Sequence, residues 1–205
     1  MRQVLATAQK LDLKYIFGGA LQGLTNILAY RGFLDEARAV GQQALTVTSA
    51  QNDRRFQGCA EAYLSVTEYF AGEHARAEHY ARAAADTLAA VSATRPFAIA
   101  LLARALLARG RPAEALLSAR DAHAQLESLG VVDDGEATIR LALAECLIAT
   151  GDTLAAREVL EKAAGRILAS AEAIEDPAIR ESFLTRIPEH RRILELARDL
   201  AASGN

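Results

Sequence analysis

Apolar residues along this chain fall in blocks with helical spacing, and short polar or glycine-containing turns separate the blocks. No alternating apolar and polar run is long enough to indicate a series of strands. The chain is therefore predicted to be all-α. The helices expected in its central part cover residues 14–31, 33–50, 54–71, 73–92, 96–109, 112–128, 135–150 and 152–174.

The strongest signal is an internal repeat built on a glycine and an alanine five residues after it. The pair occurs at Gly32/Ala37, Gly72/Ala77, Gly110/Ala115 and Gly151/Ala156. The glycines are 40, 38 and 41 residues apart, a period typical of solenoids made of helix pairs. A leucine stands eight residues before each glycine and is followed by a small residue. These dipeptides are Leu24-Thr25, Leu64-Ser65, Leu102-Ala103 and Leu143-Ala144.

Close contact between helices explains this register. Glycine allows the backbone conformation of a tight turn, and small residues let neighbouring backbones approach each other. A second alanine follows the first by seven residues, which is two helical turns later on the same face. These alanines are Ala44, Ala84, Ala122 and Ala163. Each repeat is thus predicted to be two helices joined by a glycine turn.

The repeats resemble the tetratricopeptide repeat (TPR). The segments that carry the resemblance are ILAYRGFLDEARAVGQQAL, TEYFAGEHARAEHYARAAA, ARALLARGRPAEALLSARDA and CLIATGDTLAAREVLEKAA. They cover most of residues 14–173 and imply a right-handed α–α superhelix, a TPR-like solenoid of about four helix pairs. The period exceeds the roughly 34 residues usual for the family, which indicates lengthened helices and turns. Such repeats serve many unrelated tasks, so they specify architecture better than function.

Proline and aspartate positions support the helix limits. Each proline falls where a helix should begin, the place where a missing amide hydrogen costs least. The prolines are Pro96, Pro112, Pro177 and Pro188. Asp152 and Asp176 stand just before or within first turns, where a carboxylate caps free amide groups.

The N-terminal end departs from the repeat. Residues 2–12 resemble the closing half of a helix pair, but no first half precedes them. Because a solenoid needs its terminal apolar face covered, they indicate either a fragment of a longer regulator, which is the preferred interpretation, or a capping helix. The expected organisation is a single domain, residues 1–205, with an N-terminal helix in 1–13, four repeats in 14–174 and capping helices in 175–205.

The C-terminal segment lacks the turn glycine and is expected to form two helices, 177–187 and 188–202. The second has an apolar stripe that should dock on the last repeat. The stripe comprises Ile193, Leu196, Ala197 and Leu200. The basic residues of this segment are interpreted as a solvated face, with contact to an acidic partner as the alternative. They are Arg186, His190, Arg191, Arg192 and Arg198.

The stretch FLTRIPEHRRILELA within this segment resembles the closing element of TPR arrays in large bacterial signalling proteins. Those proteins include serine/threonine kinases and ATPase-type transcriptional regulators. The resemblance implies that the chain belongs to, or evolved beside, a multidomain signalling protein of that kind.

Composition and charge restrict the function classes. A net charge of −3 gives no general attraction to phosphate, so no nucleic-acid partner is expected. Arginines interrupt the longest apolar stretches and the N-terminus has no apolar signal core. No membrane contact is therefore expected, and the chain should be soluble and cytoplasmic. Cys59 and Cys146 are far apart, each in a predicted helix, and are expected to be reduced core thiols.

No group of residues indicates catalysis. The four histidines fall in different elements or off a shared helix face, so no metal site is expected. They are His74, His79, His123 and His190. Gly18, Gly19 and Gly23 follow no strand, so neither a nucleotide site nor any other cofactor is expected. No serine lies in a nucleophile-elbow sequence and the carboxylates are dispersed, so the chain is not expected to be an enzyme.

The TPR resemblance implies a partner-binding surface. The first helix of each pair would line the concave side and expose residues two, three, six and ten positions before the turn glycine. The predicted groove comprises Gln22, Asn26, Tyr30, Val66, Tyr69, Phe70, Arg104, Leu107, Glu145 and Ile148. Aromatic residues there would anchor an apolar side chain, while Arg104 and Asn26 orient a peptide. The alternative is that the aromatics pack between repeats.

Glu68 is the clearest exception to the repeat, because it stands four residues before Gly72 where the other repeats have leucine. A buried carboxylate at this position needs a cationic partner, for which Arg104 is the candidate. The preferred interpretation is a helix that is rotated enough to expose Glu68 to solvent.

These features favour a scaffold or docking module that binds a protein segment in its concave groove and acts in a bacterial regulatory or signalling system. The alternative is a ligand sensor that binds a small inducer or a signalling peptide. A homodimer is also compatible with the sequence.

Overall fold

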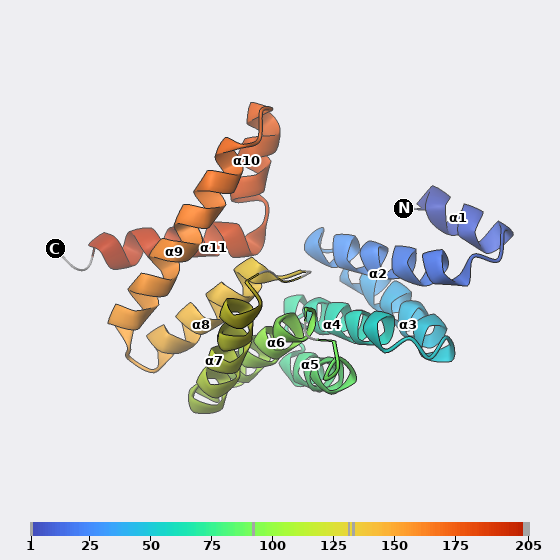
Figure 1. Cartoon of the computed structure of the whole chain (residues 1–205), viewed down its shortest axis with the longest axis horizontal. Coiled ribbons are helices and arrows are strands. Elements are labelled where there is room, and N and C mark those ends of the chain that lie inside the picture. Colours follow the sequence, from blue (N-terminus) through green and yellow to red (C-terminus); the bar gives the residue numbers. More distant parts are fainter. Residues whose placement is uncertain (1, 92, 131, 133, 203–205) are drawn as a thin grey trace.

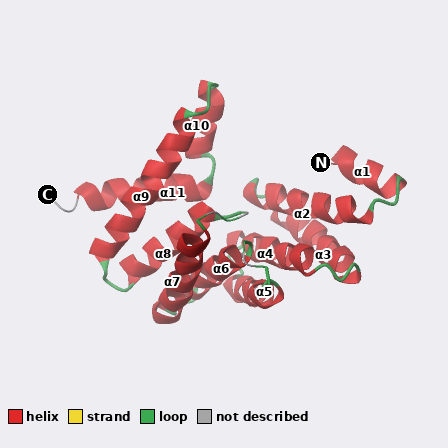
Figure 2. Ribbon diagram, in the orientation of Figure 1, coloured by secondary structure: helices red, strands yellow, loops and turns green. Residues whose placement is uncertain are grey.

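The computed structural model describes residues 2–91, 93–130, 132 and 134–202, and within these ranges the chain forms eleven α-helices and no strand (Figure 2). The helices are α1 (Arg2–Lys10), α2 (Lys14–Tyr30), α3 (Leu34–Ala50), α4 (Arg54–Phe70), α5 (His74–Thr87), α6 (Arg95–Ala108), α7 (Pro112–Leu129), α8 (Glu136–Ala149), α9 (Thr153–Glu172), α10 (Pro177–Thr185) and α11 (Pro188–Ala202). Met1, Ser92, Val131, Asp133 and residues 203–205, which the sequence predictions include, lie outside the described residues.

Four helix pairs, α2/α3, α4/α5, α6/α7 and α8/α9, form the body of the molecule as a superhelical repeat (Figure 1). Each helix packs on the next along the chain, and the first helices of successive pairs also contact each other. Helix α1 packs on α2 at one end, while α10 and α11 pack on α9 at the other. The architecture is therefore the all-α solenoid that the repeat predicts.

The first and second helices of the pairs differ in burial. Helices α6 and α8 bury residues on every side, because they contact both their own partners and the first helices of adjacent pairs. Helix α3 instead buries one stripe, comprising Ala37, Gly41, Ala44 and Thr48. In Figure 1, α3, α5 and α7 accordingly lie on the outer side of the array.

Alanine makes the contacts within the pairs close. The alanine five residues after each turn glycine is fully buried. The alanines seven residues later are also fully buried, except for slight exposure of Ala163. The leucine eight residues before the glycine is buried in three repeats, whereas Leu102 is half-buried. The residues that recur in the sequence repeat are thus the residues that pack between helices.

The turn glycines end the first helix of each pair in one shared geometry. Gly110 has φ of 73°, and its N–H donates to the carbonyl oxygen of Leu107 at 2.9 Å. The next N–H, from Arg111, donates to the carbonyl oxygen of Leu106 at 3.0 Å. The same pair of hydrogen bonds closes the other three turns, with glycine φ angles of 78°, 78° and 86°. This left-handed cap satisfies the last helical carbonyls and favours glycine.

Helix boundaries agree with the prediction to within two residues along most of the chain, but α5 ends at Thr87 and not near residue 92. The residue after its last one, Leu88, is fully buried and packs where a side chain on Gly58 of α4 would otherwise stand. A Cβ on Gly58 would come within 2.4 Å of Leu88 Cγ. Turns then connect Leu88 to α6, which Pro96 helps to start.

The prediction for Glu68 was wrong in two respects. Its side chain is fully buried, not solvated, and its partners are Arg38 and Arg76, not Arg104. Arg38 donates to both carboxylate oxygens, at 2.9 and 3.0 Å, and the Arg76 guanidinium lies at 2.9 Å. Because Arg38 belongs to α3 and Arg76 to α5, Glu68 joins α4 to the second helices of two repeats.

The C-terminal helices form as predicted, although α10 ends at Thr185. Asp176 caps α10 by accepting hydrogen bonds from the N–H groups of Ala178 and Ile179, and Asp152 caps α9 in the same manner. Ile193 and Leu196 of α11 are buried against α8 and α9, so the predicted apolar stripe docks on the last repeat.

Two glycine-to-alanine substitutions should have opposite effects on stability. Gly110→Ala forces a Cβ into left-handed backbone and should lower the free energy of unfolding by about 1 kcal/mol. Gly165→Ala lies inside α9 with open space around it and should raise that free energy by about 0.5–1 kcal/mol. Urea unfolding followed by circular dichroism measures both, and shifts of the same sign would contradict the assigned turn.

Candidate functional site

The ten residues predicted to form a groove do not line one open surface. Gln22 and Val66 are buried, and the other eight are half-buried. Val66 belongs to the central core, while the side-chain amide of Gln22 donates a hydrogen bond to the backbone carbonyl of Phe56. Gln22 and Val66 therefore hold helices together.

The aromatic residues of the set pack on one another. The rings of Tyr30 and Phe70 meet edge to face with centroids 5.3 Å apart, and the ring of Tyr69 lies 6.3 Å from that of Phe70. Because Tyr30 belongs to α2 and the other two to α4, these contacts join the first helices of two repeats. The alternative of packing between repeats thus holds for this group, which nevertheless keeps partly exposed edges.

Glu189 of α11 reaches into this group. Its Oε2 accepts a hydrogen bond from the Tyr30 hydroxyl at 3.1 Å, and its Oε1 lies 3.1 Å from the Arg104 Nη1. The Arg104 guanidinium also stacks over the Tyr69 ring at 4.5 Å from its centroid. Glu189 is only 3% exposed. A buried polar contact therefore joins the C-terminal helix to α2, α4 and α6.

Local chemistry explains why a carboxylate is stable at this point. Pro188 begins α11, so Glu189 lies in the first turn, where free amide groups favour negative charge. Burial, followed by the charge of Glu189, raises the pKa of Tyr30 well above its usual range. The hydroxyl consequently remains protonated at neutral pH and can donate to Glu189.

Helix α11 makes a second polar contact with the predicted groove, between Arg192 and Glu145 at 3.5 Å. Arg192 and Leu196 share a cavity of about 300 Å³ with five residues of the predicted set. Those five are Tyr69, Arg104, Leu107, Glu145 and Ile148. This half of the predicted groove is thus partly covered by the chain itself.

Two other residues of the set, Asn26 and Tyr30, lie in a larger groove between α2 and α10, which has a volume of about 650 Å³. Helix α2 and the residue after it supply one wall, and α10 with its flanking residues supplies the other. The lining comprises Asn26, Ile27, Tyr30 and Arg31 on the first wall, and Ile174, Ile179, Ser182, Phe183, Arg186 and Ile187 on the second. We call this cavity the α2–α10 groove.

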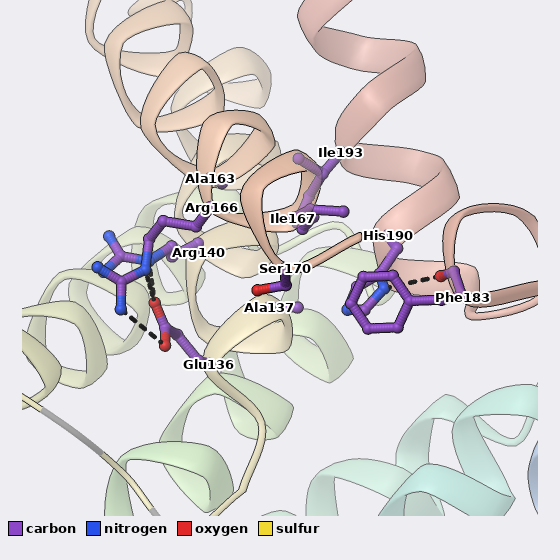
Figure 3. Close-up of a pocket in the computed structure, with 10 residues that line it drawn as sticks. All are labelled: Glu136, Ala137, Arg140, Ala163, Arg166, Ile167, Ser170, Phe183, His190 and Ile193. Atoms are coloured by element: carbon purple, nitrogen blue, oxygen red, sulfur yellow. Dashed lines mark hydrogen bonds and ion pairs between the residues drawn. The ribbon is translucent and has the colours of Figure 1, made fainter. Parts of the chain in front are cut away.

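A smaller cavity, of about 160 Å³, lies beneath the far side of α10 and is shown in Figure 3. At one end Glu136 pairs with Arg166 at 2.6 Å and with Arg140 at 3.0 Å. At the other end the His190 ring packs against Phe183, and its Nδ1 lies 2.9 Å from the Phe183 carbonyl oxygen. These polar groups already have partners, and the contacts of His190 with Phe183 hold α11 against α10.

A further cavity, of about 260 Å³, lies among α2, α4 and α6 and the segment before α8. Phe56, Tyr63 and Phe97 supply aromatic walls, with Cys59 beside them. The Tyr63 hydroxyl donates to Asp134 at 2.8 Å, and burial raises the pKa of Tyr63 far above its usual value.

Among the residues that the structure describes, no three histidine, cysteine, aspartate or glutamate side chains gather closely enough to hold a metal ion. The described helices also include none that is both long and apolar enough to cross a membrane.

No protein-family model matches the sequence, and no curated protein matches it. Solved structures do match. TPR-like repeats of a protein described as a kinesin light chain from Podosopora anserina superpose with a TM-score of 0.56 at 18% identity, over 91% of this chain and 95% of that one. A variant of those repeats with a single substitution gives a TM-score of 0.57 at 18% identity, over 90% and 94% of the two chains.

The structure is also similar to YrrB, described as a TPR protein with an unusual peptide-binding site. The TM-score is 0.53 at 15% identity, over 96% of this chain and 91% of that one. The chain has the TPR-like fold. The TPR resemblance read from the glycine and alanine register is therefore confirmed at the level of architecture.

Sequence reasoning missed the residues that α10 and α11 bring to this surface. The basic residues of the C-terminal segment were interpreted as a solvated face, yet Arg192 pairs with Glu145. Glu189 was not predicted to be a site residue, although it follows a proline that starts a helix, where an acidic side chain is favoured. Its partners lie in distant repeats, and the local pattern contains no signal for them.

Replacement of Glu189 should test how strongly α11 is held. Glu189→Ala leaves Arg104, whose side chain is 11% exposed, without its carboxylate and should lower the free energy of unfolding by about 3 kcal/mol. Glu161→Ala, an exposed position on α9, should change it by less than about 0.5 kcal/mol. Equal effects in urea titrations would show that the Glu189 contact contributes little.

Proposed function

We propose that this chain is a protein-interaction module that binds a segment of a partner protein in the α2–α10 groove. The observation that carries the proposal is the groove itself, an apolar cavity that the described helices leave open between the first repeat and the C-terminal helices. Its volume of about 650 Å³ falls in the range of sites that hold ligands.

Exposed aliphatic residues on both walls support this assignment. Ile27 of α2 is 46% exposed and Ile179 of α10 is 59% exposed, and both line the groove. Burial of two such side chains by a partner would contribute favourably, at about 25 cal/mol for each Å² of apolar surface covered.

Asn26 adds a polar recognition group. Its Oδ1 is buried and has no hydrogen-bond partner among the described residues. Because a buried acceptor without a partner is unfavourable, rotation of the Asn26 side chain toward the groove would let this oxygen accept a hydrogen bond from a peptide N–H. TPR-like architecture is also compatible with peptide recognition, since YrrB is described as having a peptide-binding site.

A peptide-display selection on the full chain tests the proposal. We expect selected peptides to bind the wild-type chain and to lose roughly tenfold in affinity, about 1.4 kcal/mol, when Ile27→Asn removes an aliphatic contact. Fluorescence anisotropy with the same labelled peptides measures the difference.

The matched control is Ile16→Asn, because Ile16 lies on the same helix, is 50% exposed and does not line the groove. It should leave the affinity unchanged. Failure to select any peptide, or equal affinity for the two variants, would reject the α2–α10 groove as the binding site.

A second candidate function is the sensing of a small inducer or signalling peptide, which the aromatic-walled cavity beside Cys59 favours. A ligand there should raise the melting temperature and slow alkylation of Cys59. Cys146 is an internal control, because burial raises the pKa of its thiol to about 12 and leaves it unreactive. A metabolite and peptide screen by thermal shift that yields no compound with both effects would count against this function.

The proposal extends to a cytoplasmic role in a bacterial regulatory or signalling system. Its support is the resemblance of the segment FLTRIPEHRRILELA to the closing element of TPR arrays in bacterial kinases and ATPase-type regulators. Sequencing of the surrounding gene region tests it. A regulator domain encoded in the same or an adjacent gene is expected, and a neighbourhood without any signalling gene would contradict the role.

A further inference from the structure

One face of helix α10 is left partly exposed by the described helices. Ile179, Ser182, Phe183 and Arg186 follow the spacing of one helical face, and all four line the α2–α10 groove. Helix α10 contacts only α9 and α11 among the described helices, and it has no fully buried residue. In Figure 1 it stands apart from α2, on the other side of the groove.

The charge of the groove has a single sign. Among the described residues that line it, Arg31 and Arg186 alone are charged, one on each wall, and both are exposed. The Arg31 guanidinium lies over the ring of Phe33, 5.4 Å from its centroid. Within the described ranges the structure gives neither arginine a carboxylate partner.

This arrangement contrasts with other arginines of the molecule. Arg38 and Arg76 are paired with Glu68, and Arg82, Arg109 and Arg111 surround Glu78. Although burial raises the pKa of Glu78, hydrogen bonds from these three arginines outweigh that effect and lower it. These five arginines thus have acidic partners, whereas Arg31 and Arg186 line the α2–α10 groove.

We infer that the α2–α10 groove takes a partner segment that combines aliphatic side chains with aspartate or glutamate. This inference rests on the proposed function and specifies the chemistry of its partner. The aliphatic side chains would contact Ile27, Ile179 and Phe183, and the carboxylates would pair with Arg31 and Arg186. Arginine suits this role because its planar fork binds carboxylate through two parallel hydrogen bonds. A basic segment would be repelled by both walls.

The test uses the peptides selected by display on the full chain. Aliphatic residues together with aspartate or glutamate should be enriched in the selected sequences relative to the library. Replacement of the acidic residues by lysine in a selected peptide should weaken binding at least roughly tenfold. Affinity for the parent peptide should fall as salt rises, because the ion pairs are exposed to solvent.

Arg186→Glu should weaken the parent peptide and partly restore binding of the lysine peptide, a reversal that general destabilisation does not produce. Arg120→Glu is the matched control, because Arg120 is an exposed arginine on α7 outside the groove. It should change neither affinity. Circular dichroism melting of both variants checks that they remain folded.

The outcomes separate the two proposals. If Ile27→Asn weakens binding but the lysine peptide and Arg186→Glu behave like the parent, the groove binds peptides and the acidic partner is rejected. If no peptide is selected, both proposals fail. Sedimentation of the chain alone tests whether a second copy of the chain occupies the groove. If the chain forms a dimer and Ile179→Asn dissociates it, a second copy occupies the groove and the inference is overturned.

Discussion

The structure depends on the close approach of paired helices that buried alanines permit. Ala37, Ala77, Ala115 and Ala156 have no solvent exposure, and each faces a partner helix without a side chain long enough to separate the two backbones. Larger residues there would force the helices apart, and interiors this densely packed accommodate extra volume poorly. The spacing between helices, and with it the curvature that brings α10 and α11 opposite α2, follows from these small residues.

The fold was predictable because its determinants are local and recur along the chain. A glycine at the end of a helix adopts left-handed backbone for the same reason in every repeat, and the alanine five residues later has the same neighbours each time. The premature end of α5 was not predictable in this way. The next residue, Leu88, fills the space beside Gly58 of α4, a contact that the sequence pattern of either segment does not reveal.

Only part of the candidate site was predictable from the sequence. Arg104 and Tyr30 could be assigned to faces of their helices from the repeat register, and both are half-buried in the structure. Their shared partner, Glu189, comes from a helix outside the repeat. Glu68 shows the same limit of prediction. Its departure from the leucine pattern indicated an unusual position, but its partners, Arg38 and Arg76, belong to neighbouring second helices. Sequence periodicity identifies a face, whereas the pairing of charges across faces depends on superhelical geometry.

The contact between Tyr30 and Glu189 also changes how the array should behave as a cooperative unit. The two residues are 159 positions apart, and they link the first repeat to the last helix. In an open solenoid each unit senses only its neighbours, so the ends fray independently and folding spreads along one dimension. A contact that joins the two ends couples their fraying, since release of α11 removes a partner from α2. It also raises the mean separation of contacting residues, a property associated with slower and more concerted folding. The molecule is therefore a linear array by sequence, but its first repeat and the last of its described helices are coupled in stability.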